Sequence, residues 1–138
     1  MQRPVHRFRV GITGSYGGLN LGDEAILKSI ITQLRASLPV EILVFSRNAE
    51  DTLRRHDVEQ AVPVRDMTRE EAKAAVAGLD VLVFGGGGIL YDHEAEIYLR
   101  EVILAQELGV PVMVYAVSAG PLQTRTARER VATAITQA

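Results

Sequence analysis

The segment that decides the fold runs from Phe8 to Glu24 and consists of FRVGIT followed by GSYGGLNLGDE. Its first six residues are rich in Val, Ile and Phe without a clean polar alternation, which is typical of a strand covered on both faces. Downstream of the glycines, apolar side chains recur at the four-residue steps of a helix, at Ile26, Ile30, Leu34 and Leu38. The segment therefore predicts a strand, a glycine-rich loop and a helix in succession.

The same alternation continues along the whole chain. Five strands are predicted in all: Arg7–Thr13, Glu41–Ser46, Gln60–Val64, Asp80–Phe84 and Pro111–Val117. Helical patterns occupy Asp23–Ser37, the neighbourhood of Ala49–Arg55, Arg69–Ala77, Ala95–Leu108 and a last segment from about Thr126. Strands that alternate with helices of this length indicate right-handed βαβ units with helices on both faces of a parallel sheet. We therefore predict a doubly wound, Rossmann-like α/β fold with strand order 3-2-1-4-5.

Composition bounds the class of protein. The chain has 138 residues, the length of about one domain, of which 47% are hydrophobic and 23% charged, as in globular proteins. Its formal net charge of −2 provides no electrostatic basis for nucleic-acid binding. The absence of cysteine excludes disulfides, thiolate metal sites and cysteine nucleophiles. Without a signal peptide or an apolar run long enough to span a bilayer, we expect a cytoplasmic protein with no transmembrane segment.

Two glycine-rich stretches are expected to face one crevice. In a sheet of this order, ligands bind outside the carboxyl ends of the strands where the winding reverses, between the first and fourth strands. The loops predicted to meet there are Gly14–Gly22 and Gly85–Asp92, the latter with the sequence GGGGILYD.

The first of these loops does not match a dinucleotide-binding site. The usual G-x-G-x-x-G fingerprint and the acid that holds the ribose are both absent, and the second predicted strand ends at Ser46-Arg47. Instead, Asn20 is a favourable N-cap, and Asp23 and Glu24 occupy the positive end of the helix, where their carboxylates would repel a phosphate. This arrangement favours binding of sugar hydroxyls or deprotonation of an alcohol. The simpler alternative is that these three residues only cap the helix.

Other candidates lie farther along the chain. The run Gly85, Gly86, Gly87 and Gly88 would allow a substrate to approach closely or would present N–H groups to an anion, although it could equally serve tight packing between loops. After the last strand, Ser118 and the arginines at 125, 128 and 130 are where an anion would arrive, unless those arginines are simply solvated. His93 is a candidate acid or base, but it has no second spaced ligand, so no metal site is predicted.

Four segments together resemble the polysaccharide pyruvyl transferase family, and most of all the bacterial branch that acts on secondary cell-wall polymers. They are Gly17–Leu27 (GGLNLGDEAIL), Ser46–Asn48 (SRN), Asp80–Asp92 (DVLVFGGGGILYD) and Tyr115–Leu122 (YAVSAGPL). The coupling of N-L-G-D-E to D-x-L-x-x-G-G-G is far more specific than an isolated glycine loop. The resemblance runs from about residue 8 to the end of the chain.

The resemblance implies transfer of the carboxyvinyl unit of phosphoenolpyruvate to sugar hydroxyls, which forms a pyruvate ketal and releases phosphate. It also implies a two-domain enzyme that resembles GT-B glycosyltransferases, with residues 1–138 as the first Rossmann-like half and a missing C-terminal domain. The final segment Arg128–Ala138 agrees, because its helical pattern has neither a capping signal nor a following strand. A lipid-linked saccharide acceptor is the expected partner, and no cofactor is expected besides the donor substrate.

The resemblance also suggests roles for particular residues. Asp23 or Glu24 would orient or deprotonate the acceptor hydroxyl, and His93, or an acid of the missing half, would protonate the enol carbon. Contacts to the substrates are expected from Ser15, Tyr16, Asn20, Gly85–Gly88 and Ser118, with Arg47 and Arg125 as candidates for the donor charge. Two alternatives remain: a GT-B-like glycosyltransferase that uses a nucleotide sugar, and a non-catalytic Rossmann-like binding module.

Overall fold

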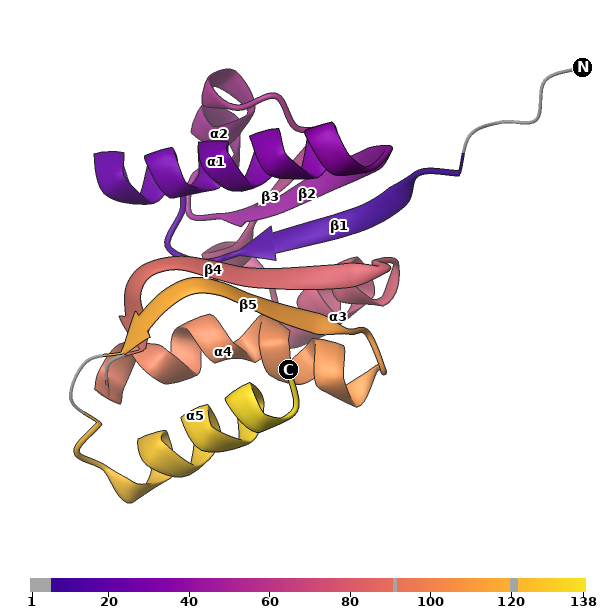
Figure 1. The fold of residues 1–138 in the computed structure, drawn as a ribbon. Helices are drawn as coiled ribbons and strands as arrows, with labels where there is room; N and C mark the ends of the chain where they lie inside the picture. The colour runs from indigo at the N-terminus through magenta and orange to yellow at the C-terminus, as the bar shows by residue number, and fades with distance from the viewer. Residues whose placement is uncertain (1–5, 91, 120–121) are drawn as a thin grey trace, which may run out of the picture.

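The computed structural model describes residues 6–90, 92–119 and 122–138. Five parallel strands form one sheet in the order β3-β2-β1-β4-β5, which confirms the predicted fold and strand order (Figure 1). The strands are β1 (Phe8–Thr13), β2 (Val40–Ser46), β3 (Gln60–Pro63), β4 (Val81–Leu90) and β5 (Val112–Ala119). The helices are α1 (Leu21–Ser37), α2 (Ala49–Arg55), α3 (Arg69–Ala77), α4 (Asp92–Glu107) and α5 (Arg125–Thr136), and a 3-10 turn, η1 (Val64–Asp66), follows β3.

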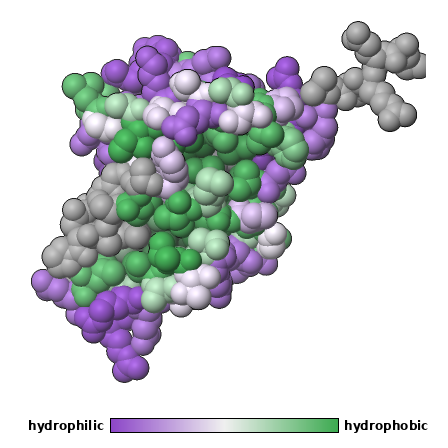
Figure 2. Space-filling model, in the orientation of Figure 1, coloured by the Kyte–Doolittle hydropathy of each residue, from purple (hydrophilic) through white to green (hydrophobic). Residues whose placement is uncertain are grey.

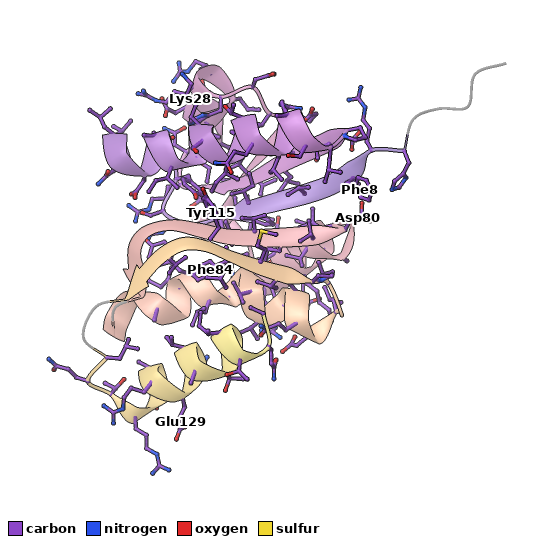
Figure 3. All side chains as sticks on the ribbon, viewed as in Figure 1. Phe8, Lys28, Asp80, Phe84, Tyr115 and Glu129 are labelled. Atoms are coloured by element: carbon purple, nitrogen blue, oxygen red, sulfur yellow. The ribbon has the colours of Figure 1, made fainter. Side chains whose placement is uncertain are left out.

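Helices cover both faces of the sheet. Figure 1 shows α1 and α2 on one side and α3, α4 and α5 on the other. Each face has its own apolar core, one of which includes Val10, Leu27 and Val83, and the other Phe84 and Leu99. Val83 and Phe84 are neighbours on β4 that serve opposite cores, because successive side chains of a strand point to opposite faces. Figure 3 shows Phe84 on the side of α4.

The second glycine-rich stretch is a strand rather than the predicted loop. β4 continues through Gly85–Gly88 to Leu90, because Gly85, Gly87 and Gly88 pair with Tyr115, Val117 and Ser118 of β5. Strand pairing uses backbone N–H and C=O groups, so a run without side chains can extend a strand when a neighbouring strand is present. The predicted loop Gly85–Asp92 is therefore wrong: α4 begins at Asp92, three residues before the predicted start.

The β5 side of the sheet carries exposed apolar side chains. Met113 is 56% exposed and Tyr115 is 37% exposed, although the Tyr115 hydroxyl accepts a hydrogen bond from Gln33 of α1 at 3.3 Å. Figure 2 shows apolar residues gathered over β4 and β5 between polar margins, and Figure 3 shows Tyr115 on the side of α1. Among the helices in the described ranges, none combines the length and apolar character needed to cross a membrane.

Candidate functional site

The two glycine-rich stretches meet at the carboxyl end of β1. A Cβ atom added to Gly14 would lie only 2.2 Å from the carbonyl oxygen of Gly85, so the two backbones are in direct contact. The Tyr16 hydroxyl donates a hydrogen bond of 2.5 Å to that same carbonyl. The predicted convergence of residues 14–24 with the start of the glycine run is therefore present in the structure.

Tyr16 lies beneath the loop rather than on its surface. Its side chain is fully buried, and burial raises the pKa of the phenol far above its ordinary value, with smaller contributions from the negative charges of Asp23 and Glu24. The hydroxyl therefore stays protonated and holds Gly85. Gly86, with φ of 99°, completes this contact, because a Cβ atom there would lie 2.6 Å from the Tyr16 hydroxyl.

The two adjacent acids of α1 have different environments. Glu24 is buried, and its Oε1 accepts a hydrogen bond of 2.8 Å from the N–H of Gly17. Its Oε2 lies 2.7 Å from Nε2 of His56, a residue whose role was not predicted from the sequence. Both carboxylate oxygens of Glu24 thus hold the loop and the end of α2, which closes the glycine loop against its neighbours.

Asp23 lies at the start of α1 and is only partly buried. Asn20 caps this helix, since its Oδ1 accepts hydrogen bonds from the N–H groups of Gly22 at 2.9 Å and Asp23 at 3.2 Å. Burial raises the pKa of the Asp23 carboxyl above its ordinary value; a hydrogen bond from Ser15 opposes this, the charge of Glu24 adds to it, and Arg47 opposes it. Asp23 is therefore a carboxylate of increased basicity beside Ser15.

Ser15 connects Asp23 to a second group of polar side chains. Arg47, directly after β2, donates hydrogen bonds to Ser15 Oγ at 3.1 Å and to the Tyr98 hydroxyl at 2.5 Å. Tyr98, from α4, in turn donates to Ser15 Oγ at 3.1 Å. Arg65, on η1 after β3, donates to the Tyr98 hydroxyl at 3.4 Å and places its guanidinium 5.9 Å from the centre of the ring.

This second group opens into a cavity of about 680 Å³ on the side of the sheet covered by α3, α4 and α5. Its volume is within the range of small-molecule sites. The lining is drawn from the ends of β1 and β2, from η1 and from the helices: Thr13, Gly14, Arg47, Val64, Arg65, Arg69, Ile97, Tyr98, Arg100, Glu101, Ile103, Glu107 and Arg130.

Several contributors to this site were not predicted from the sequence. Tyr98 and Arg65 lie in segments predicted only as a helix and as a connection after a strand. Neither position has a local sequence signal, because their approach to Arg47 depends on how α4 and η1 pack against the end of β2. Among the described residues, no group of three or more His, Cys, Asp or Glu could hold a metal ion.

The remaining predicted residues are placed as follows. Gly87, Gly88 and Ser118 lie in the paired part of β4 and β5. Arg125 is exposed, forms an ion pair of 2.8 Å with Glu129 one helical turn away, and is not among the residues that line the cavity. His93 lies in the first turn of α4, and the placement of its side chain is outside what the structure describes.

Comparison with known proteins gives one family match. The model of the polysaccharide pyruvyl transferase family matches residues 20–138, which is most of the chain. The search of curated proteins found no match.

Proposed function

The chain belongs to the polysaccharide pyruvyl transferase family, and we propose that it takes part in transferring the carboxyvinyl unit of phosphoenolpyruvate to a sugar of a cell-surface polysaccharide. One sugar hydroxyl adds to C2 of the donor while C3 gains a proton. The second hydroxyl then displaces phosphate from C2, which leaves a pyruvate ketal and inorganic phosphate. Both hydroxyls lose their protons, so the reaction requires a general base and a general acid.

The observation that carries the proposal is the position of Asp23. Its carboxylate stands at the carboxyl edge of the sheet, beside Ser15, where ligands of such folds bind. Its raised pKa makes it a better proton acceptor than an ordinary aspartate. We assign deprotonation of the acceptor hydroxyl to Asp23 rather than to Glu24, because both oxygens of Glu24 are engaged by Gly17 and His56.

The neighbours of Asp23 on the loop surface are suited to orient a sugar. Ser15 is a partly exposed residue and Asn20 is an exposed one, and both belong to the loop that precedes α1. We keep these two residues as contacts to the acceptor and assign Tyr16 to support of the loop. His93 and an acid from a second domain are the two candidates for the general acid.

We further propose that residues 1–138 form the first half of a two-domain enzyme of the GT-B type. The exposed Met113 and Tyr115 on β5 support this, because apolar side chains along a sheet edge are suited to contact with further protein. The acceptor, on this proposal, is a lipid-linked saccharide handled in the cytoplasm.

The test is phosphate release from phosphoenolpyruvate by the complete enzyme in the presence of a saccharide acceptor. Asp23→Asn is expected to lower turnover by about 10²- to 10⁴-fold, the usual contribution of a general base, with unchanged folding. Glu50→Gln is the matched control, because Glu50 is an exposed acid in the first turn of α2. Normal turnover of Asp23→Asn, or full activity per folded molecule in a destabilised variant, would leave Asp23 with a capping role only.

A further inference from the structure

The cavity beside Ser15 has more positive than negative side chains. Five arginines and two glutamates line it. Both glutamates are paired within the wall: Glu107 with Arg69 at 2.9 Å, and Glu101 with Arg100 at 2.8 Å. Positive charge therefore remains in the wall after the glutamates are balanced.

Arg47 and Arg65 differ from Arg69 and Arg100 of the same cavity, because their hydrogen bonds go to hydroxyl groups rather than to carboxylates. The hydrogen bonds of Arg47 go to the hydroxyls of Ser15 and Tyr98, and that of Arg65 goes to Tyr98. Among the side chains that the structure describes, neither guanidinium has a carboxylate at ion-pair distance. Both side chains are exposed, so a ligand can reach them from solvent.

Arg47 and Arg65 are held in place by a common partner. Both donate to the hydroxyl of Tyr98, which is itself 6% exposed and fixed by packing of α4 against the sheet. Guanidinium groups bind phosphate and carboxylate through paired N–H donors, and fixing them beforehand lowers the entropy lost on binding. Val64, Ile97 and Ile103 supply an apolar wall suited to a short carbon skeleton.

We propose that Arg47, Arg65 and Tyr98 form a subsite for a small phosphorylated carboxylic acid. The inference rests on the proposed function, in which this ligand is phosphoenolpyruvate. It keeps Arg47, which the resemblance named as a candidate for the donor charge, and adds Arg65 and Tyr98 beside it. Ser15 contacts both Asp23 and Arg47, so the acceptor base and the donor anion lie on either side of one serine.

The experiment is calorimetric titration of the 138-residue chain with phosphoenolpyruvate, without any acceptor. Saturable binding is expected, weakened about 10- to 100-fold by Arg47→Gln or Arg65→Gln, as for the loss of a hydrogen bond to a charged group. Arg54→Gln is the control, because Arg54 is an exposed arginine of α2 on the opposite face of the sheet. Binding should weaken as salt rises, because both arginines are exposed.

Three results would contradict the proposed subsite. They are the absence of saturable binding of phosphoenolpyruvate by the chain, binding by the Arg65→Gln variant as tight as that by the wild type, and binding of a nucleoside diphosphate in preference to phosphoenolpyruvate. Turnover of the complete enzyme separates this inference from the proposed function. Arginine-dependent binding without phosphate release would retain the subsite and refute the function, whereas normal turnover by the double variant Arg47→Gln, Arg65→Gln would refute the subsite and retain the function.

Discussion

Asp23 and Glu24 are neighbours in sequence and both lie in the first turn of α1, yet they have different surroundings. Successive residues of a helix are about 100° apart around its axis, so one side chain can turn inward while the other stays at the surface. Glu24 turns inward to Gly17 and His56, and Asp23 remains beside Ser15. At the scale of single residues, the structure separates a buried carboxylate that supports the loop from a partly exposed one, which we propose as the base.

His56→Ala should destabilise the chain by about 1–3 kcal/mol, because it leaves an oxygen of the buried Glu24 carboxylate without its partner. Urea unfolding followed by circular dichroism measures this change. His6→Ala is the matched control, since His6 is exposed near the start of the described chain and should alter stability by about 0.5 kcal/mol or less. Equal stability of the two variants would show that Glu24 does not depend on His56.

Because the Tyr16 phenol is buried, we expect the folded chain to lose stability at alkaline pH. The folded state raises the pKa of its phenol, so the unfolded chain loses this proton first, near the ordinary value of about 10. The stabilising contribution is therefore complete below about pH 10 and declines as pH rises above it. Urea titrations between pH 8 and 11 should show a steeper decline for the wild type than for Tyr16→Phe; parallel curves would contradict the buried, protonated phenol.

At the scale of elements, the loop between β1 and α1 is shaped by what it packs against. The N–H of Arg47 donates to the carbonyl of Tyr16 at 2.9 Å, which joins the loop to the end of β2. Gly17 has φ of 80°, and a Cβ atom there would lie 2.3 Å from Ser46 Oγ and 2.6 Å from the backbone nitrogen of Asn48. The loop can approach β2 this closely only where it carries no side chain.

Gly17→Ala should therefore cost about 2–4 kcal/mol, from its left-handed backbone and from overpacking against Ser46 and the backbone that follows β2. Gly18→Ala is the paired control one residue away, where the nearest atom to the added Cβ is Nη1 at the far end of the Arg47 side chain, 3.0 Å away, rather than a backbone atom. Thermal unfolding of the two variants compares them directly. A similar melting temperature for both would mean that the loop can move away from β2.

At the scale of the whole molecule, the parallel sheet brings the residues of the candidate site together at the edge where its strands end. All strand pairs are parallel, so β1, β2 and β3 end on the same side, where Gly14, Arg47 and η1 follow them. Helices on both faces then supply Asp23 from α1 and Tyr98 from α4. The proposed acceptor base and donor subsite thus come from opposite layers and meet at the loop that contains Ser15.

The 138-residue chain alone should release no phosphate from phosphoenolpyruvate with any saccharide acceptor. The reason is that the proposed active site needs a second domain to enclose the substrates and exclude water. A coupled phosphate assay on the purified chain tests this, with the complete enzyme as the positive control. Sustained turnover by the isolated chain would refute the two-domain proposal.

Local sequence was sufficient to predict the architecture. Residues 8–13 and 41–46 are rich in Val, Ile and Phe without a clean polar alternation, which indicated strands buried on both faces. The four-residue spacing from Ile26 indicated α1, because a helix buried along one stripe repeats its apolar residues at that step. A run of glycines has no pattern of apolar and polar side chains, so the sequence does not indicate whether it is a strand or a loop. The continuation of β4 through Gly88 therefore had to be read from its pairing with β5.

The sequence by itself indicated the succession of strands and helices, the loop at the end of β1 and the acidic start of α1, because these follow from patterns among residues close in the chain. The strand order was predicted from the usual winding of alternating strands and helices. Only the tertiary structure decided which acid is buried and which arginines share the hydroxyl of Tyr98. Glu24 and His56 are 32 residues apart, and Arg47 and Tyr98 are 51 apart. Pairings over such distances depend on how helices pack against the sheet, and no local pattern of residues records that packing.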